Sequence, residues 1–105
     1  MTKKDVLKEL KKVNIPVAYN HFAESDRVKL PFMVYFFPSA SNFAADGSVY
    51  YKKDVLHIEL YTEKKNIELE EKVESILEEN GLFYKKTEIW ISEEKMYEIL
   101  YETEV

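Results

Sequence analysis

The chain has 105 residues, the length of one domain with a single sheet-and-helix core, so we expect one domain over residues 1–105. Its hydrophobic content of 46% and aromatic content of 14% are typical of globular proteins and exclude wholesale disorder. The absence of cysteine excludes disulfides, thiolate metal sites and cysteine nucleophiles. The net charge of −5 lies entirely in residues 88–105, and an acidic segment of this kind repels phosphate backbones. We therefore expect no specific nucleic-acid binding.

A first helix is predicted at residues 2–13, because apolar residues recur there with helical spacing. Thr2 and Asp5 have the spacing of a capping box, with Asp in place of the usual Glu, and Pro16 ends the helix. The rest of the helix surface carries five lysines: Lys3, Lys4, Lys8, Lys11 and Lys12. They could form a patch for a membrane or a nucleic acid, but a solvated helix face is the simpler interpretation.

Three strands are predicted next, at Val17–Phe22, Phe32–Phe37 and Val49–Thr62. The second is apolar on both faces, as in a central strand, and the third alternates apolar and polar residues. Between them lies a polar segment, Ser39–Ser48, which we predict to be a long loop. Long loops in small domains often serve a function, so this loop is the first candidate for a partner surface.

The second half of the chain is predicted to hold one helix and two strands. Asn66 is the candidate N-cap of the helix, and Asn80-Gly81 gives it a left-handed stop. The strands are expected at Phe83–Ile91 and Met96–Thr103. The predicted fold is therefore α+β, a single antiparallel sheet packed with two helices in the order α-β-β-β-α-β-β.

The sequence contains no recognisable catalytic, metal or cofactor motif, and we expect the protein not to be an enzyme. The two histidines, His21 and His57, have no further ligand at metal-binding spacing. The two glycines, Gly47 and Gly81, are too few for a phosphate-binding loop. No apolar run approaches the roughly 20 residues of a membrane span, so we expect no membrane partner and a location in the cytoplasm of the producing cell.

Surface aromatic residues are the strongest indication of a partner. Eight tyrosines are more than a small core can bury with their hydroxyl groups hydrogen-bonded, so some are expected at rims or interfaces. Partial exposure at the edge of the sheet is the structural alternative. The candidate interface residues are Asn42, Phe43, Asp46, Gly47, Tyr50, Tyr51, Trp90, Tyr97 and Tyr101.

Acidic residues near the end of the chain form a second candidate surface. Residues 88–105 contain a single lysine and six glutamates: Glu88, Glu93, Glu94, Glu98, Glu102 and Glu104. They could line an acidic channel or form a solvated acidic rim. Because side chains alternate along a strand, only some of them can face any one surface.

The sequence resembles a family of small structural proteins from Firmicutes siphophages and prophages. The likeness covers nearly the whole chain and rests on the segments Leu30–Pro38, Asn42–Lys52, Ile58–Lys65, Glu70–Glu74, Phe83–Lys86 and Tyr97–Glu102. Within that group, the predicted order of elements is similar to tail terminator, or tail completion, proteins. The final strand, Met96–Thr103, departs from the tail-terminator pattern.

The resemblance implies a virion protein that forms a ring, expected to be a hexamer, at the head-proximal end of the tail tube. Its partners would be further copies of itself, the tail tube and the head connector, and it would pass through the host cytoplasm during assembly. The family has no catalytic residues to transfer to this chain, and the segment Ser39–Val49 would contact neighbours or the tube. Two alternatives remain: a head-completion or minor capsid protein of the neck, and a small intracellular acidic module that binds another protein.

Overall fold

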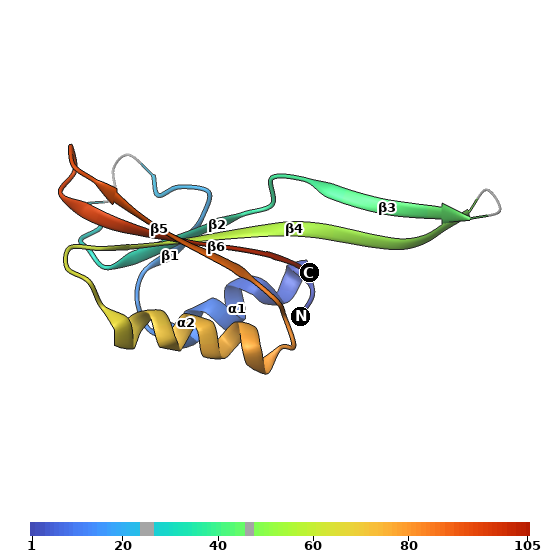
Figure 1. The fold of residues 1–105 in the computed structure, drawn as a ribbon, viewed down its shortest axis with the longest axis horizontal. Coiled ribbons are helices and arrows are strands. Elements are labelled where there is room, and N and C mark those ends of the chain that lie inside the picture. Colours follow the sequence, from blue (N-terminus) through green and yellow to red (C-terminus); the bar gives the residue numbers. More distant parts are fainter. Residues whose placement is uncertain (24–26, 46–47) are drawn as a thin grey trace.

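The computed structural model describes residues 1–23, 27–45 and 48–105, and for residues 42–45 and 48–51 it describes the backbone only. The elements are, in chain order, η1 (Lys3–Asp5), α1 (Val6–Leu10), η2 (Lys11–Val13), β1 (Val17–Tyr19), β2 (Phe32–Phe36), β3 (Ala40–Ala45), β4 (Ser48–Thr62), α2 (Ile67–Glu79), β5 (Lys85–Ile91) and β6 (Met96–Glu104). Figure 1 shows both α-helices on one side of the sheet. The predicted α+β class is confirmed.

The sheet has the strand order β1-β2-β4-β6-β5, with β3 paired to β4 away from this path. All its pairings are antiparallel except one, because β1 runs parallel to β2 with Ala18 opposite Val34. The purely antiparallel sheet predicted from the sequence is therefore wrong at this edge. A parallel pair needs a connection of about a dozen residues or more, and the long segment between β1 and β2 supplies it.

The predicted helix ends are confirmed by their hydrogen bonds. The Asp5 carboxylate accepts bonds from the backbone N–H and the hydroxyl of Thr2, at 3.1 and 2.8 Å. Asn66 Oδ1 accepts a bond of 3.0 Å from the N–H of Leu69 and caps α2. Gly81 follows α2 with a φ of 69°, a conformation in which glycine avoids the strain that a Cβ would cause.

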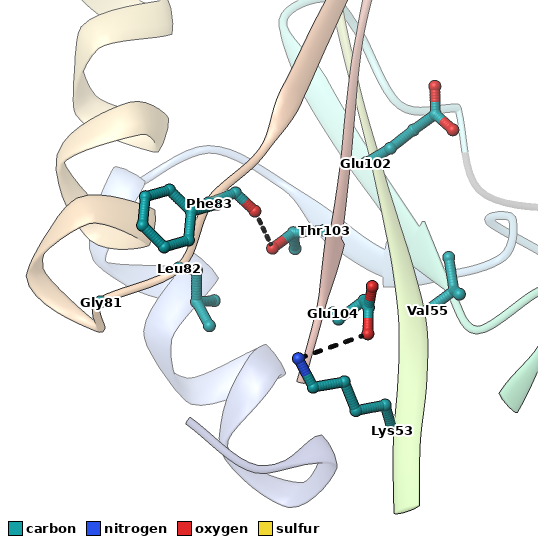
Figure 2. A pocket seen from close by; sticks show the side chains of 8 residues that line it. All are labelled: Lys53, Val55, Gly81, Leu82, Phe83, Glu102, Thr103 and Glu104. Carbon is teal, nitrogen blue, oxygen red and sulfur yellow. Dashed lines mark hydrogen bonds and ion pairs between the residues drawn. The ribbon is translucent and has the colours of Figure 1, made fainter. Parts of the chain in front are cut away.

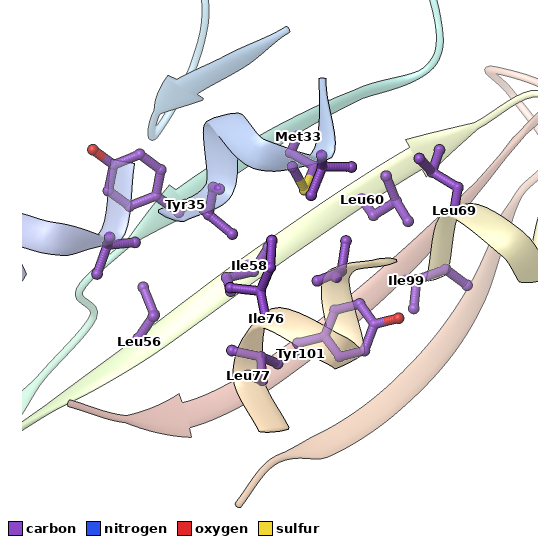
Figure 3. Close-up of a cluster of buried hydrophobic side chains, with 14 residues drawn as sticks. Met33, Tyr35, Leu56, Ile58, Leu60, Leu69, Ile76, Leu77, Ile99 and Tyr101 are labelled. Atoms are coloured by element: carbon purple, nitrogen blue, oxygen red, sulfur yellow. The ribbon is translucent and has the colours of Figure 1, made fainter. Parts of the chain in front are cut away.

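The hydrophobic core lies between the helices and one face of the sheet (Figure 3). Leu56, Ile58 and Leu60 of β4 are fully buried there, as their alternation predicts. Val73 and Leu77 of α2 are equally inaccessible. At about 25 cal/mol per Å² of buried apolar area, this layer is the main source of the stability of the fold.

A buried ion-pair network joins α2 to β5. Glu70 is only 2% exposed, and its carboxylate lies 2.8 Å from the ammonium groups of both Lys65 and Lys86. Burial alone would raise the pKa of Glu70, but these two lysines outweigh it and hold that pKa below its usual value. Lys86 also binds Glu74, which accepts a 2.7 Å bond from the hydroxyl of Tyr101. Glu70 therefore stabilises the fold in its ionised form.

Candidate interface surfaces

The segment predicted to be a loop is a β-strand. β3 runs antiparallel to the first part of β4, from Ala40 opposite Asp54 to Ala45 opposite Ser48, with a bulge between Phe43 and Ala44. We call these two strands, Ala40–Ala45 and Ser48–Asp54, the arm. The long-loop prediction is therefore wrong. The composition misled it, because the segment is rich in Ser, Ala and Asn, residues that favour turns or have little strand preference.

The arm projects from the rest of the molecule, which we call the body (Figure 1). β3 pairs only with β4, and the molecule measures 52 × 29 × 25 Å. Its radius of gyration is 15.2 Å, against about 13 Å for a compact domain of this length. A two-stranded hairpin alone is marginally stable in water, so an arm of this kind is suited to packing against a partner.

Six of the predicted interface residues fall in or beside the arm. Asn42, Phe43, Tyr50 and Tyr51 lie on its strands, and their side chains are outside the part of the chain that the structure describes. Asp46 and Gly47 lie outside the described residues altogether. The interface assignment of all six stays a prediction.

The sheet face opposite the helices is the second candidate surface, and we call it the open face. Strand register places the following described side chains on it: Phe32, Val34, Phe36, Lys53, Val55, His57, Glu59, Tyr61, Lys85, Thr87, Ile89, Ile91, Met96, Glu98, Leu100, Glu102 and Glu104. The described residues that follow β1 cover one end of this face, where Phe22 packs against Phe32 with ring centroids 5.4 Å apart. The remainder has no covering layer in the described part of the chain.

Polar contacts cross the open face between β4 and β6. The hydroxyl of Tyr61 donates to the carboxylates of both Glu59 and Glu98, the second bond being 2.8 Å long. Burial raises the pKa of Glu98, and the neighbouring Glu59 carboxylate acts in the same direction. His57 Nε2 lies 3.4 Å from the carboxylate of Glu102. These contacts fix five polar side chains between apolar neighbours on the open face.

The six glutamates singled out near the end of the chain do not share one surface. Glu98, Glu102 and Glu104 lie together on the open face. Glu88 is on the helix side, 2.6 Å from Lys65, while Glu93 and Glu94 are exposed at the turn between β5 and β6. Alternation along the strands separates them, as expected.

Trp90 and Tyr97 form an aromatic pair near the β5–β6 turn. Their ring centroids are 4.7 Å apart, and Trp90 is 51% exposed. This pair remains a candidate contact. Tyr101 is fully buried in the core and is therefore not part of any exposed surface, because its position on β6 faces the helices.

Phe83 is the most exposed large apolar side chain among the described residues, at 96%. It borders an open cavity of about 430 Å³ between the α2–β5 connection and the root of the arm (Figure 2). Thr103 Oγ1 donates a 2.6 Å bond to the carbonyl of Phe83, and Lys53 pairs with Glu104 at 3.6 Å. The sequence pattern predicts Phe83 at the start of a strand, and no local pattern signals its exposure.

Groups of three or more His, Cys, Asp or Glu that could hold a metal are absent from the ranges 1–23, 27–45 and 48–105. In the same ranges, no helix is long and apolar enough to cross a membrane.

A scan against protein-family models matches none of them to this chain, and a search of curated proteins also finds no match.

Proposed function

We propose that the protein is a virion structural component of a Firmicutes siphophage or prophage, a tail terminator that forms a ring at the head-proximal end of the tail tube. It stops polymerisation of the tube and docks the head connector. The sequence resemblance suggests this role. The arm is the observation that best supports it, because β3 pairs with β4 alone and extends beyond the body.

The arm fits this role for a physical reason. Subunits of a ring meet through two different surfaces, since one surface of each copy contacts another surface of the next. The projecting hairpin is one such surface, and the body of the neighbouring copy offers the other. The pair of the exposed Trp90 and the half-buried Tyr97 offers a further contact for the tube or the connector.

A ring through which DNA passes benefits from acidic groups on its exposed surface, because lysine and arginine would hold the phosphate backbone. Glu93 and Glu94 are exposed, and neither has an ion-pair partner in the described part of the chain. We assign these two residues to an acidic rim of the ring.

Deletion of the gene from an inducible prophage tests the function. The induced lysate is examined by negative-stain electron microscopy, with the gene supplied in trans as the control. We expect headless tails of excessive length, because polymerisation of the tube is no longer stopped. Normal virions from the deletion strain would contradict a role in the particle.

The same images separate the alternative functions. Tails of normal length beside heads that have lost their DNA would indicate a head-completion protein of the neck. An unchanged particle yield would favour the small intracellular binding module. A complementing gene without arm residues 41–52 should behave like the deletion if the arm is needed for ring formation.

A further inference from the structure

One side of the helical layer carries lysines that form no ion pair in the described part of the chain. Lys4, Lys8 and Lys11 are exposed and follow helical spacing along η1, α1 and η2. None of the three forms an ion pair within the described ranges, whereas the neighbouring Lys12 is paired with Glu9. We call Lys4, Lys8 and Lys11 the lysine face.

The open face, on the other side of the sheet, combines negative charge with apolar side chains. Glu98, Glu102 and Glu104 follow one another along β6 over about 20 Å, because strand residues rise about 3.4 Å each. Leu100 lies between them and Phe36 stands two strands away, both half-buried. The solvent-facing side of an antiparallel sheet is usually polar, so this mixture is suited to being covered.

We propose that the lysine face of one copy docks on the open face of the next copy. This contact rests on the self-assembly in the proposed function, and it specifies which surfaces of the two bodies meet. Charge complementarity selects the occupant, because three lysines without an ion pair in the described ranges meet a face with four glutamates and two lysines. These lysines are Lys85 and Lys53, and Lys53 pairs with Glu104, so the face keeps a negative excess.

The two surfaces also match in size. The helical segment Lys3–Val13 is about 16–20 Å long and about 10 Å wide. The open face spans strands β2, β4, β6 and β5, about 14 Å from the first to the last at the usual strand spacing. One helical segment therefore covers the acidic row and the apolar residues beside it.

The charges on α2 decide which helix docks. Its exposed side carries Glu71, Glu78 and Glu79, which the acidic open face would repel. The docked copy must therefore place η1, α1 and η2 over the glutamates and α2 away from them. Because the two surfaces differ, the contact is head-to-tail, and repetition closes it into a ring or extends it as a filament.

Two charge-reversal variants test the contact. The first is Lys4→Glu/Lys8→Glu/Lys11→Glu and the second is Glu102→Lys/Glu104→Lys. Each is measured by light scattering after gel filtration at low and high salt, with circular dichroism as the check of folding. Lys64→Glu/Lys72→Glu is the matched control, since both lysines are exposed and have no ion-pair partner in the ranges the structure describes.

We expect the wild-type chain and the control to assemble at low salt and to dissociate as salt is raised, because screening weakens the contact. Each reversal variant alone should be monomeric, since its two surfaces carry the same charge. An equimolar mixture of the two variants should assemble again, because the reversed helix of one meets the reversed sheet of the other. Misfolding cannot produce this rescue.

The outcomes separate this proposal from the proposed function. If the wild-type protein assembles and both variants assemble equally well, the docking contact is wrong while the ring stands. If both variants are monomeric and their mixture stays monomeric, the pairing of these two surfaces is also wrong. The wild-type protein could also remain monomeric at its highest soluble concentration and at every salt concentration. That result would overturn both the docking contact and the self-assembled ring.

Discussion

Strand β4 belongs to two regions with different surroundings. Its second half, from Val55, lies between β2 and β6 and beneath the helices, with Leu56, Ile58 and Leu60 fully buried. Its first half, in the arm, pairs with β3. The body is held by burial of apolar area between two layers, and the arm by the backbone ladder of one hairpin. One continuous strand thus links a region that supplies stability to a region that we propose supplies contacts.

The largest expected effect is in the body half of β4. Ile58→Ala removes a fully buried side chain from the centre of the core and leaves a cavity. We expect a loss of about 3–4 kcal/mol in the free energy of unfolding, measured by urea denaturation. A loss below about 1 kcal/mol in the free energy of unfolding would mean that the helices are not packed tightly on this face, and the body would then not differ from the arm in this respect.

A smaller effect is expected at the junction of α2 with β5. Glu70→Gln keeps the shape of the side chain but removes the charge that Lys65 and Lys86 share. Both lysines keep a second partner, Glu88 and Glu74, and are partly exposed to solvent. We therefore expect a loss of about 1–2 kcal/mol at neutral pH, below the range for breaking a fully buried pair.

The same variant should change the dependence of stability on pH. The pKa of Glu70 is lowered in the folded state, so its contribution is present above the unfolded value near 4.5. The contribution is lost as pH falls through the folded pKa. The stability difference between wild type and Glu70→Gln should be constant near neutral pH and shrink in acid. A difference that persists at the lowest pH where the protein stays folded would show that packing, and not charge, sets the cost.

The smallest effect on stability is expected in the arm. Phe43→Ala alters β3, which pairs with β4 and with no other strand in the described part of the chain. The melting temperature of the isolated chain should therefore stay almost unchanged, and its free energy of unfolding should stay within about 1 kcal/mol of wild type. Assembly should nevertheless be lost if the arm contacts a neighbour. A cost of about 3–5 kcal/mol, typical of a core Phe truncation, would place Phe43 in a core and remove the distinction between the two regions.

Several features follow from the sequence alone because their causes are local. The caps at Thr2–Asp5 and Asn66, the left-handed stop at Gly81 and the buried alternation of β4 depend on neighbours within a few residues. The α+β class follows from the order of these elements. The arm did not follow in this way, because the residues of β3 have little strand preference and the sequence predicted a loop there.

Other features were decided only by the tertiary structure, because they depend on which strands become neighbours. The parallel pairing of β1, the burial of Tyr101 and the exposure of Phe83 follow from sheet order and helix placement. The separation of Glu88 from Glu98, Glu102 and Glu104 requires the register of β5 against β6. Glu70 looks like one of several exposed acids of an amphipathic helix, and only the approach of β5 brings Lys86 against it and buries it. The sequence of an element determines its periodicity, whereas the strand or helix that becomes its neighbour is set by tertiary packing.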